Sequence, residues 1–314
     1  MSKAKVSAEN GGDEVVFLNP MTCGIYKDGG ARYKIDHATG ERTDEIDNEL
    51  GDHVDQYLAG TMPPGVARAK LADTLSSRVL VPRYYDMRWE DQIRAMLAKE
   101  KIEPVTIGEL IDQQVITVRG GHGSPSNDKR TGNIPYVKVS DIRSLRVNVN
   151  PTNLVTRAVA EKFWRKKKTS GLQAWDLITP NRASSNIGEF AILLPGEEQV
   201  FIIRVVEGGD EGYDPFYLLW CLCLKVVRRQ WQRVTLMQTN REDCGNRYRE
   251  IVLPKPKSKA WADEMAAPFR DYFTTLATAR TKLLDELTKS GHEYIASAHS
   301  VGSVVVEGES SGGN

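Results

Sequence analysis

The order of apolar and polar positions along the chain predicts short strands and helices that lead into one long helix. Apolar residues that alternate with polar ones, or that form short continuous runs, favour strands, whereas apolar residues three or four apart favour helices. Strand-like runs are EVVFLNP, SSRVLVPRYY, VITVRGG, IPYVKVSDI, AWDLITP, EFAILLP, VFIIRVV and IVLPKP, and ARYKIDHATGER has the turn residues of a hairpin. Helix-like runs are TDEIDNELGDHVDQYLAG, RWEDQIRAMLAKEKI, TIGELIDQQ, NLVTRAVAEKFWRKKK and DPFYLLWCLCLKVVRRQWQRV. In the first of these helices the apolar positions recur every four residues, at Ile46, Leu50, Val54 and Leu58.

Two of the predicted helices carry capping signals at their starts. Thr106 is followed three residues later by Glu109, which is the pattern of a capping box. Asp214 is an N-cap residue, and Pro215 follows it at the first helical position, where its missing N–H costs nothing. The second signal predicts one continuous helix over DPFYLLWCLCLKVVRRQWQRV.

The last part of the chain, from Ser258 onward, predicts a long helix with an apolar stripe at alternating spacings of four and three. Such a stripe is typical of a helix that pairs lengthwise with another helix. The candidate interface residues are Met265, Phe269, Tyr272, Leu276, Leu283 and Leu287. Pro268 removes a backbone hydrogen bond inside the pattern, so we expect the regular helix to begin near Pro268 and end near Gly291.

Composition and charge favour a globular protein with a basic centre. The chain has 314 residues, of which 40% are hydrophobic and 27% are charged. Its net charge is zero, but residues 101–256 carry 23 Lys/Arg against 17 Asp/Glu, a balance of +6. Much of the compensating acid lies in residues 36–55, so the basic centre favours a polyanionic partner.

No apolar run reaches the roughly 18 residues of a membrane-spanning helix, and the N-terminus lacks a secretory signal. Both features favour a cytoplasmic protein without a membrane partner.

The order of the central motifs resembles a known family. GNIPYVKVSDI, AWDLITPNRASSNIGEFAIL and IVLPKP occur in this order before the long helix. This succession resembles the DNA specificity subunits of type I restriction–modification systems over about residues 100–290. The resemblance implies an α/β (α+β) target recognition domain, residues 100–257, followed by a long coiled-coil-type helix, residues 258–291. Family members usually carry two such domains and two helices, so this chain resembles a half-length form that is completed by a second copy or a second specificity half.

Residues 15–99 form a small mixed region that is not typical of that family. They resemble the C-terminal tail of adenine-N6 DNA methyltransferase subunits, which implies an interface for such a subunit. The expected function is a non-catalytic subunit that directs the methyltransferase to a site on double-stranded DNA in phage defence. A restriction or translocase subunit is a further candidate partner. The chain itself would need no cofactor, because S-adenosylmethionine would bind the methyltransferase. Polar segments 1–14 and 292–314 are expected to be disordered.

Loop chemistry and the resemblance together define candidate DNA contacts. An arginine fork matches guanine O6 and N7, a side-chain amide matches adenine N6 and N7, and lysines suit phosphates. The candidates are Lys129, Arg130, Lys138, Arg165, Lys166, Lys167, Lys168, Asn181, Arg182, Ser184, Ser185, Asn186, Gln238, Asn240, Arg241 and Arg247. The alternative for each is a solvated turn or helix end with side-chain to backbone hydrogen bonds.

Catalytic and metal chemistry find little support in the residues. The tetrapeptide that begins at Asn19 is NPMT, which lacks the second proline and the aromatic residue of an adenine-binding methyltransferase motif. Carboxylates do not form a convincing metal set, and the four cysteines favour buried thiols over a disulfide framework or a metal site. Two alternatives stay open, namely part of a split methyltransferase or restriction enzyme, and a scaffold of a defence complex that does not bind DNA.

Overall fold

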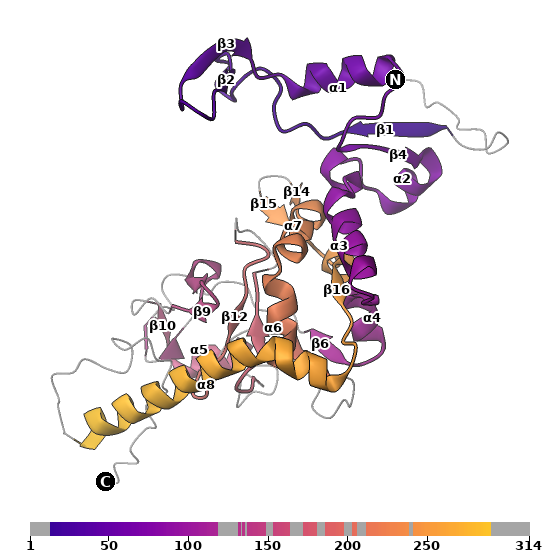
Figure 1. The fold of residues 1–314 in the computed structure, drawn as a ribbon. Coiled ribbons are helices and arrows are strands. Elements are labelled where there is room, and N and C mark those ends of the chain that lie inside the picture. Colours follow the sequence, from indigo (N-terminus) through magenta and orange to yellow (C-terminus); the bar gives the residue numbers. More distant parts are fainter. Residues whose placement is uncertain are drawn as a thin grey trace.

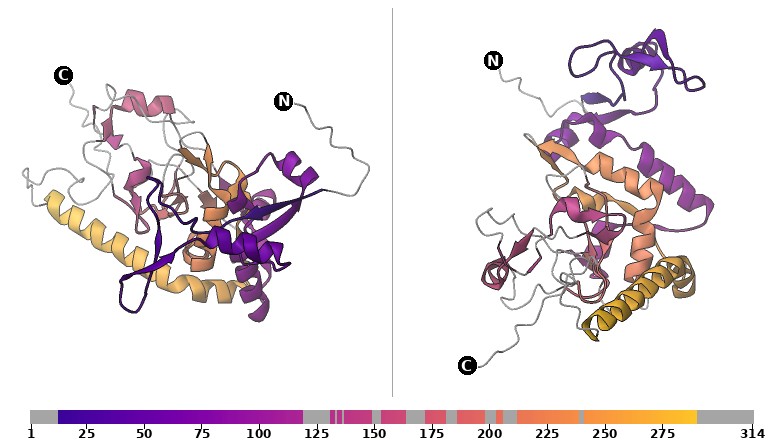
Figure 2. Two further views of the ribbon diagram at one scale, coloured as in Figure 1. Left: turned by 90° about the horizontal axis from the view of Figure 1, so that it is seen from above. Right: turned by 90° about the vertical axis from the view of Figure 1, so that its left-hand side faces the viewer.

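The computed structural model describes residues 13–118, 131–132, 134–135, 137–148, 153–163, 172–180, 186–197, 203–205, 212–238 and 241–289. Within these residues the chain is a mixed α/β protein with small antiparallel sheets and one long C-terminal helix (Figure 1). The expectations for the two terminal segments lie outside the described residues, apart from Asp13 and Glu14. An N-terminal arm, residues 13–87, and the long helix lie at opposite ends of the molecule in Figure 1 and in the right view of Figure 2.

Two separate strand pairs build the N-terminal arm. β1 (Glu14–Leu18) pairs antiparallel with β4 (Val66–Lys70), and β2 (Tyr33–Ile35) forms a hairpin with β3 (Arg42–Ile46). The helical elements of the arm are α1 (Glu49–Leu58), α2 (Leu71–Ser77) and the 3-10 helix η1 (Pro82–Tyr85). The expected first strand and hairpin are therefore confirmed.

Two expectations for the arm were wrong. The helix predicted over residues 43–60 begins only at Glu49, because Asn48 caps it by accepting a hydrogen bond from the Gly51 N–H at 3.1 Å. Ile46 consequently lies in β3 and not in the helix. SSRVLVPRYY is not a strand: α2 ends in it at Ser77, Arg78 follows with a left-handed φ of 55°, and η1 begins at Pro82. Proline has no N–H for a strand ladder.

A central block, residues 88–257, contains most of the elements. Its helices are α3 (Arg88–Lys99), α4 (Ile107–Asp112), α5 (Arg157–Phe163), α6 (Pro215–Cys223) and α7 (Lys225–Val234), with 3-10 helices η3 (Val139–Asp141) and η4 (Arg247–Glu250). Its strands are β5 (Pro104–Thr106), β6 (Ile116–Val118), β7 (Ile134–Pro135), β8 (Ile142–Arg143), β9 (Arg146–Val147), β10 (Leu154–Val155), β11 (Leu177–Ile178), β12 (Ala191–Ile192), β13 (Ile203–Val205), β14 (Leu236–Gln238), β15 (Arg241–Asp243) and β16 (Val252–Pro254).

The largest sheet has the strand order β12-β11-β13-β6, and all its pairings are antiparallel. A second pairing, β5 with β16, joins the start of the block to its end. IPYVKVSDI is not one strand as expected. The Lys138 N–H donates to Asp141 Oδ2 at 2.8 Å and closes a 3-10 turn between β7 and β8.

Both predicted caps are present. Thr106 Oγ1 accepts from the Glu109 N–H at 3.1 Å, and the Glu109 carboxylate accepts from the Thr106 N–H at 2.7 Å. Asp214 accepts from two backbone N–H groups at the start of α6. The single helix expected from Asp214 is instead two helices, because Leu224 adopts extended dihedrals (φ −60°, ψ 129°) that end α6 and start α7.

One hydrophobic core joins the helices of the block to the long helix α8 (Lys259–Lys289). Ile93 and Leu97 of α3, the apolar residues of α6, and Phe273 of α8 belong to the same buried cluster. The boundaries expected at 99/100 and 257/258 therefore pass through this core. α8 also begins nine residues before Pro268 and continues through it, because Ala262 and Ala266 are buried against the core and hold its first turns in place.

A buried arginine connects the arm to the block. The Arg233 guanidinium on α7 forms ion pairs with Glu90 at 3.3 Å and Glu250 at 2.9 Å, and it donates to the Tyr84 carbonyl at 3.3 Å. Only 7% of its side chain is exposed. Since Tyr84 belongs to η1 and Glu90 to α3, one cation holds elements from both parts.

Replacement of this arginine is expected to destabilise the protein strongly. Arg233→Ala removes one of the two cations paired with the buried Glu90 and leaves only the half-exposed Arg94, and we expect a loss of about 3 kcal/mol in the free energy of unfolding. Arg157→Ala removes an exposed i,i+4 pair with Glu161 and should cost about 1 kcal/mol or less. Urea unfolding followed by circular dichroism measures both; equal losses would contradict the role given to Arg233.

A second prediction concerns pH and Asp86. Burial acts to raise the pKa of this carboxyl, but hydrogen bonds from Arg88 and Asn19 outweigh burial and lower it. A lowered pKa stabilises the fold above the ordinary carboxyl pKa, and this stability is lost as the pH falls through the lowered value. Asp86→Asn should therefore have a lower melting temperature than the wild type at pH 7. The difference between the two melting temperatures should become smaller below about pH 4. Thermal unfolding across pH tests this, with Asp91→Asn on the exposed side of α3 as control.

Candidate nucleic-acid interface

Two of the loops predicted to contact DNA follow strands of the main sheet whose last residues lie at the same end of that sheet. β13 pairs antiparallel with both β6 and β11, so β6 and β11 run in the same direction. Their last residues, Val118 and Ile178, therefore lie at the same end of the sheet. Ile178 is paired there with Ala191 of β12. The candidate loops 122–133 and 181–186 follow these two strand ends in the sequence. The topology thus gives loops 60 residues apart a common origin.

The chain that re-enters the sheet after loop 181–186 is held by specific contacts. Thr179 Oγ1 at the end of β11 donates to the Glu189 carbonyl at 2.7 Å. Glu189 also pairs with Arg228 of α7 through its carboxylate. Gly188 has a φ of +92°, and a Cβ there would lie 2.9 Å from Trp231 Cγ, so only glycine fits without a shift. The loop therefore begins and ends on a well-packed base.

Two predicted DNA contacts, Lys138 and Asn186, are brought into one small region. Asn186 Nδ2 donates to the Val139 carbonyl at 3.4 Å, which places the end of loop 181–186 beside η3. The β8–β9 turn in turn contacts the sheet, since the Ile192 N–H donates to the Leu145 carbonyl at 3.2 Å. Lys138 at the start of η3 and Asn186 therefore lie near the same edge strand, β12.

The electrostatics of this region favour an anion. Asp141 is buried, and its carboxylate accepts hydrogen bonds from the Lys138 N–H and the Ser140 hydroxyl. Arg143 is exposed and uses its Nε to donate to the Ser140 carbonyl at 3.0 Å. Among the described residues, no carboxylate lies within ion-pair distance of the side chains of Lys138 or Arg143. We call Lys138, Arg143 and Asn186 the η3 cluster.

Arg143 was missed by the sequence reasoning. It follows GNIPYVKVSDI directly, but the expected strand suggested no turn at that place. The 3-10 turn of η3 brings the cations of positions 138 and 143 to one region. A signal existed in the SD pair, because Ser and Asp favour turns through side-chain to backbone bonds.

Most of the other predicted DNA contacts lie outside the described residues. These are Lys129, Arg130, Arg165, Lys166, Lys167, Lys168, Asn181, Arg182, Ser184, Ser185 and Asn240. Gln238 and Arg241 pair with each other at the end of the β14–β15 hairpin, which follows α7 on the side away from α8 (Figure 1). Their backbones are described and their side chains are not.

The prediction for Arg247 needs correction. Its Nε donates to the Val234 carbonyl at 3.0 Å, and its Nη2 donates to the Asp243 carbonyl at 2.8 Å. Two of its three nitrogens are thus used to hold the β14–β15 hairpin against α7. Arg247 is therefore a structural residue and is not carried into the interface.

The stripe predicted on the long helix also needs correction. Met265, Phe269 and Leu276 are partly buried against the chain's own core, so they are not a free partner face. Tyr272 is 60% exposed and Leu283 is 45% exposed, and the side chain of Leu287 lies outside the described residues. The reason is that α8 packs on α6 and not on a second long helix of the described chain.

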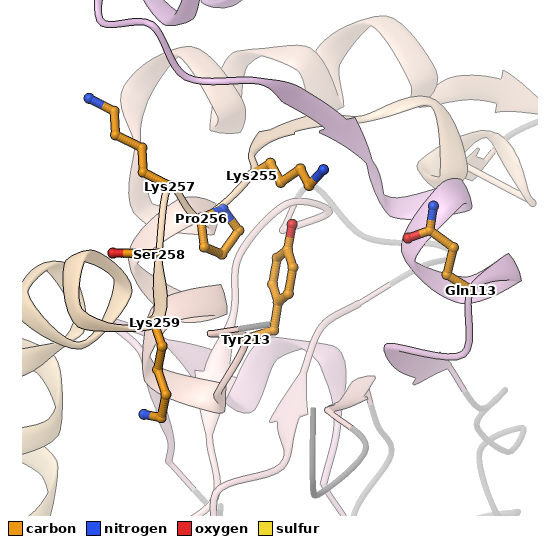
Figure 3. A pocket seen from close by; sticks show the side chains of 7 residues that line it. All are labelled: Gln113, Tyr213, Lys255, Pro256, Lys257, Ser258 and Lys259. Carbon is orange, nitrogen blue, oxygen red and sulfur yellow. The ribbon is translucent and has the colours of Figure 1, made fainter. Parts of the chain in front are cut away.

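A shallow cavity of about 330 Å³ lies where β16 leads into α8. It is lined by Gln113, Tyr213, Lys255, Pro256, Lys257, Ser258 and Lys259 (Figure 3). All three lysines have partners: Lys255 pairs with Glu103 at 2.8 Å, Lys259 pairs with Asp263 at 2.7 Å, and Lys257 lies 5.7 Å from the Trp261 ring. Figure 3 shows Lys257 and Lys259 pointing away from the cavity, so we assign it no ligand.

Other kinds of site are not found in the described part of the chain. No group of His, Cys, Asp or Glu side chains there could hold a metal ion. Burial raises the pKa of Cys223 to about 11, so its thiol is a poor nucleophile. No helix among the described residues is both long and apolar enough to cross a membrane. Neither a protein-family model nor a curated protein sequence matches the chain.

Gly188 provides a test of the loop base. Gly188→Ala should lower the free energy of unfolding by about 2–4 kcal/mol, because it adds a clash with Trp231 to the strain of a positive φ. Gly196→Ala is the matched control, since Gly196 has a φ of +89° with nothing within 4 Å of a Cβ, and should cost about 1 kcal/mol. If chemical denaturation shows the two variants to be equally stable, Trp231 does not constrain this loop.

Proposed function

We propose that the chain is a non-catalytic DNA-recognition subunit that directs an adenine-N6 methyltransferase to its target site. In this proposal residues 100–257 act as a target recognition domain, and the exposed side of the long helix, which includes Tyr272 and Leu283, joins them to a second copy or a second specificity half. S-adenosylmethionine would bind the methyltransferase. A restriction or translocase subunit would complete a cytoplasmic defence complex.

The observation that carries the proposal is the η3 cluster at the base of loop 181–186. Lys138 and Arg143 offer cationic groups without described carboxylate partners, and such groups position a duplex through its phosphates. Asn186 lies on the adjacent segment, where its Nδ2 donates to the Val139 carbonyl and holds this segment beside the two cations. Phosphate affinity would then come from Lys138 and Arg143, and base discrimination from the sequence candidates Asn181 and Arg182.

The common origin of the two candidate loops supports the same proposal. The major groove of a duplex is about 12 Å wide and admits one helix or a two-stranded ribbon, so two loops that enter it together must start close to each other. Loops that follow strand ends at the same end of a sheet can enter one groove together, whereas loops at opposite ends of the sheet cannot. The basic balance of residues 101–256 adds a favourable field for DNA.

The proposal predicts a salt-dependent affinity that depends on the η3 cluster. The full chain should bind duplex DNA, with an affinity that falls steeply between about 50 and about 200 mM salt. Lys138→Ala and Arg143→Ala should each reduce the slope of log affinity against log salt by about 1, because each removes one phosphate contact. Lys99→Ala, at the exposed end of α3, should leave the slope unchanged. Fluorescence anisotropy with a labelled duplex measures all four proteins.

Two outcomes would replace the proposal. A wild-type chain whose DNA affinity has no salt slope, or shows no binding, favours a scaffold that does not contact DNA. Methyl transfer by the isolated chain to duplex DNA in the presence of S-adenosylmethionine favours part of a split methyltransferase.

A further inference from the structure

The N-terminal arm exposes far more apolar surface than the rest of the described chain. Sixteen large apolar side chains are strongly exposed among the described residues, and twelve of them belong to residues 13–87. In the same range Phe17 and Pro63 are the apolar side chains that are buried among the described residues. Monomeric proteins rarely expose large contiguous apolar patches unless these bind something.

Seven of these twelve residues belong to one small unit, residues 20–58, which we call the hairpin unit. Backbone hydrogen bonds join its parts: Gly24 N–H to the Asp47 carbonyl at 2.9 Å, and Leu50 N–H to the Thr22 carbonyl at 3.0 Å. A Cβ on Gly24 would lie 3.2 Å from Ile46 Cγ2, so this side chain covers the neighbouring segment. The exposed members are Met21, Ile25, Tyr26, Ile35, Ile46, Leu50 and Leu58.

Helix α1 shows most directly that a surface is left uncovered. Its predicted apolar stripe includes Leu50 and Leu58, which are 36% and 77% exposed. The residue that α1 buries is His53, which lies 3.3 Å from the Glu49 carboxylate. An amphipathic surface helix normally buries its apolar stripe against the core of its own protein. Val54 of the same stripe is half-buried, but Leu50 and Leu58 on either side of it stay exposed, which is the arrangement of a helix that completes its packing with another molecule.

The charge of the hairpin unit restricts what can cover it. The unit contains nine Asp/Glu against four Lys/Arg, a net charge of −5. Two of the cations are already used in pairs, Arg32 with Asp47 at 2.9 Å and Lys34 with Glu45 at 3.0 Å. Two copies of the unit placed face to face would therefore repel each other, whereas a cationic surface would be attracted.

We propose that the hairpin unit is a docking surface for a different folded protein, whose contact face combines apolar side chains with a rim of lysine and arginine. The base of the arm is held to the block through Arg233 and Asp86, so a protein bound there would keep a defined position relative to the η3 cluster. The inference rests on the exposed apolar residues and their charge, and it does not require that the chain bind DNA.

The experiment removes the apolar stripe without changing charge. Leu50→Gln together with Leu58→Gln keeps good helix formers at exposed positions, so the fold should be retained. Met96→Gln, at a 36% exposed position of α3, is the matched control. Tagged full chains of the wild type and both variants are produced in the native host and purified. The protein that stays bound to the wild type in a one-to-one ratio is then identified and purified separately.

Binding is measured between the purified companion and each chain. We expect the double variant to bind about tenfold or more weakly, the control to bind within about twofold of the wild type, and the wild-type affinity to fall between about 50 and about 300 mM salt. Hydrogen exchange of the α1 amides should slow when the companion binds. The double variant should bind DNA as tightly as the wild type does. A chain that fails to bind DNA would therefore contradict the proposed function without contradicting this inference.

Several results would overturn the inference. One is a double variant that binds the companion as tightly as the wild type does. Another is a wild-type chain that is dimeric by light scattering while the double variant is monomeric, since a second copy would then be the occupant. The absence of any companion in a one-to-one ratio would also refute it.

Discussion

The burial of one carboxylate between two arginines is the constraint on which the arrangement of sheet and long helix depends. Glu197 is fully buried at the turn after β12, where it accepts from the Leu194 N–H at 2.9 Å. Its Oε1 pairs with Arg146 of β9 at 3.2 Å and with Arg280 of α8 at 2.5 Å. Burial raises the pKa of Glu197, and these partners oppose that shift. A charge so deep is tolerated only while both cations stay in place, so α8 and the β8–β9 turn are held to the same point.

This constraint links the long helix to the region that carries the η3 cluster. Arg146 immediately follows the β8–β9 turn, and that turn contacts β12 through Leu145. Any displacement of α8 around Arg280 would therefore strain the strands beside Lys138 and Asn186. At the other end of the block, Arg233 connects the arm in the same manner. Buried ion pairs therefore act together with the shared hydrophobic core to fix α8 against the block, and an ion pair also fixes the arm.

Local chemistry was predicted well where the interacting atoms are close in sequence. The capping box at Thr106, the Asp214 cap and helix α3 all follow from residues three or four positions apart. Errors arose where a local signal competed with a distant contact. The apolar run after Asp214 has no helix breaker, yet Leu224 turns so that α6 and α7 can both pack into the core. Pro268 looked like a helix start, but the burial of Ala262 and Ala266 extended the helix past it.

The sequence by itself determined the capped starts of α4 and α6, the helix α3, the basic centre and the acidic N-terminal region, because composition and short spacings set these properties. Only the tertiary structure decided that Arg247 is used internally, that α8 packs on its own block, and that Lys138, Arg143 and Asn186 lie together. It also decided that the stripe of α1 stays exposed. These outcomes depend on pairs of residues that are distant along the chain, and no local pattern records which of them will meet.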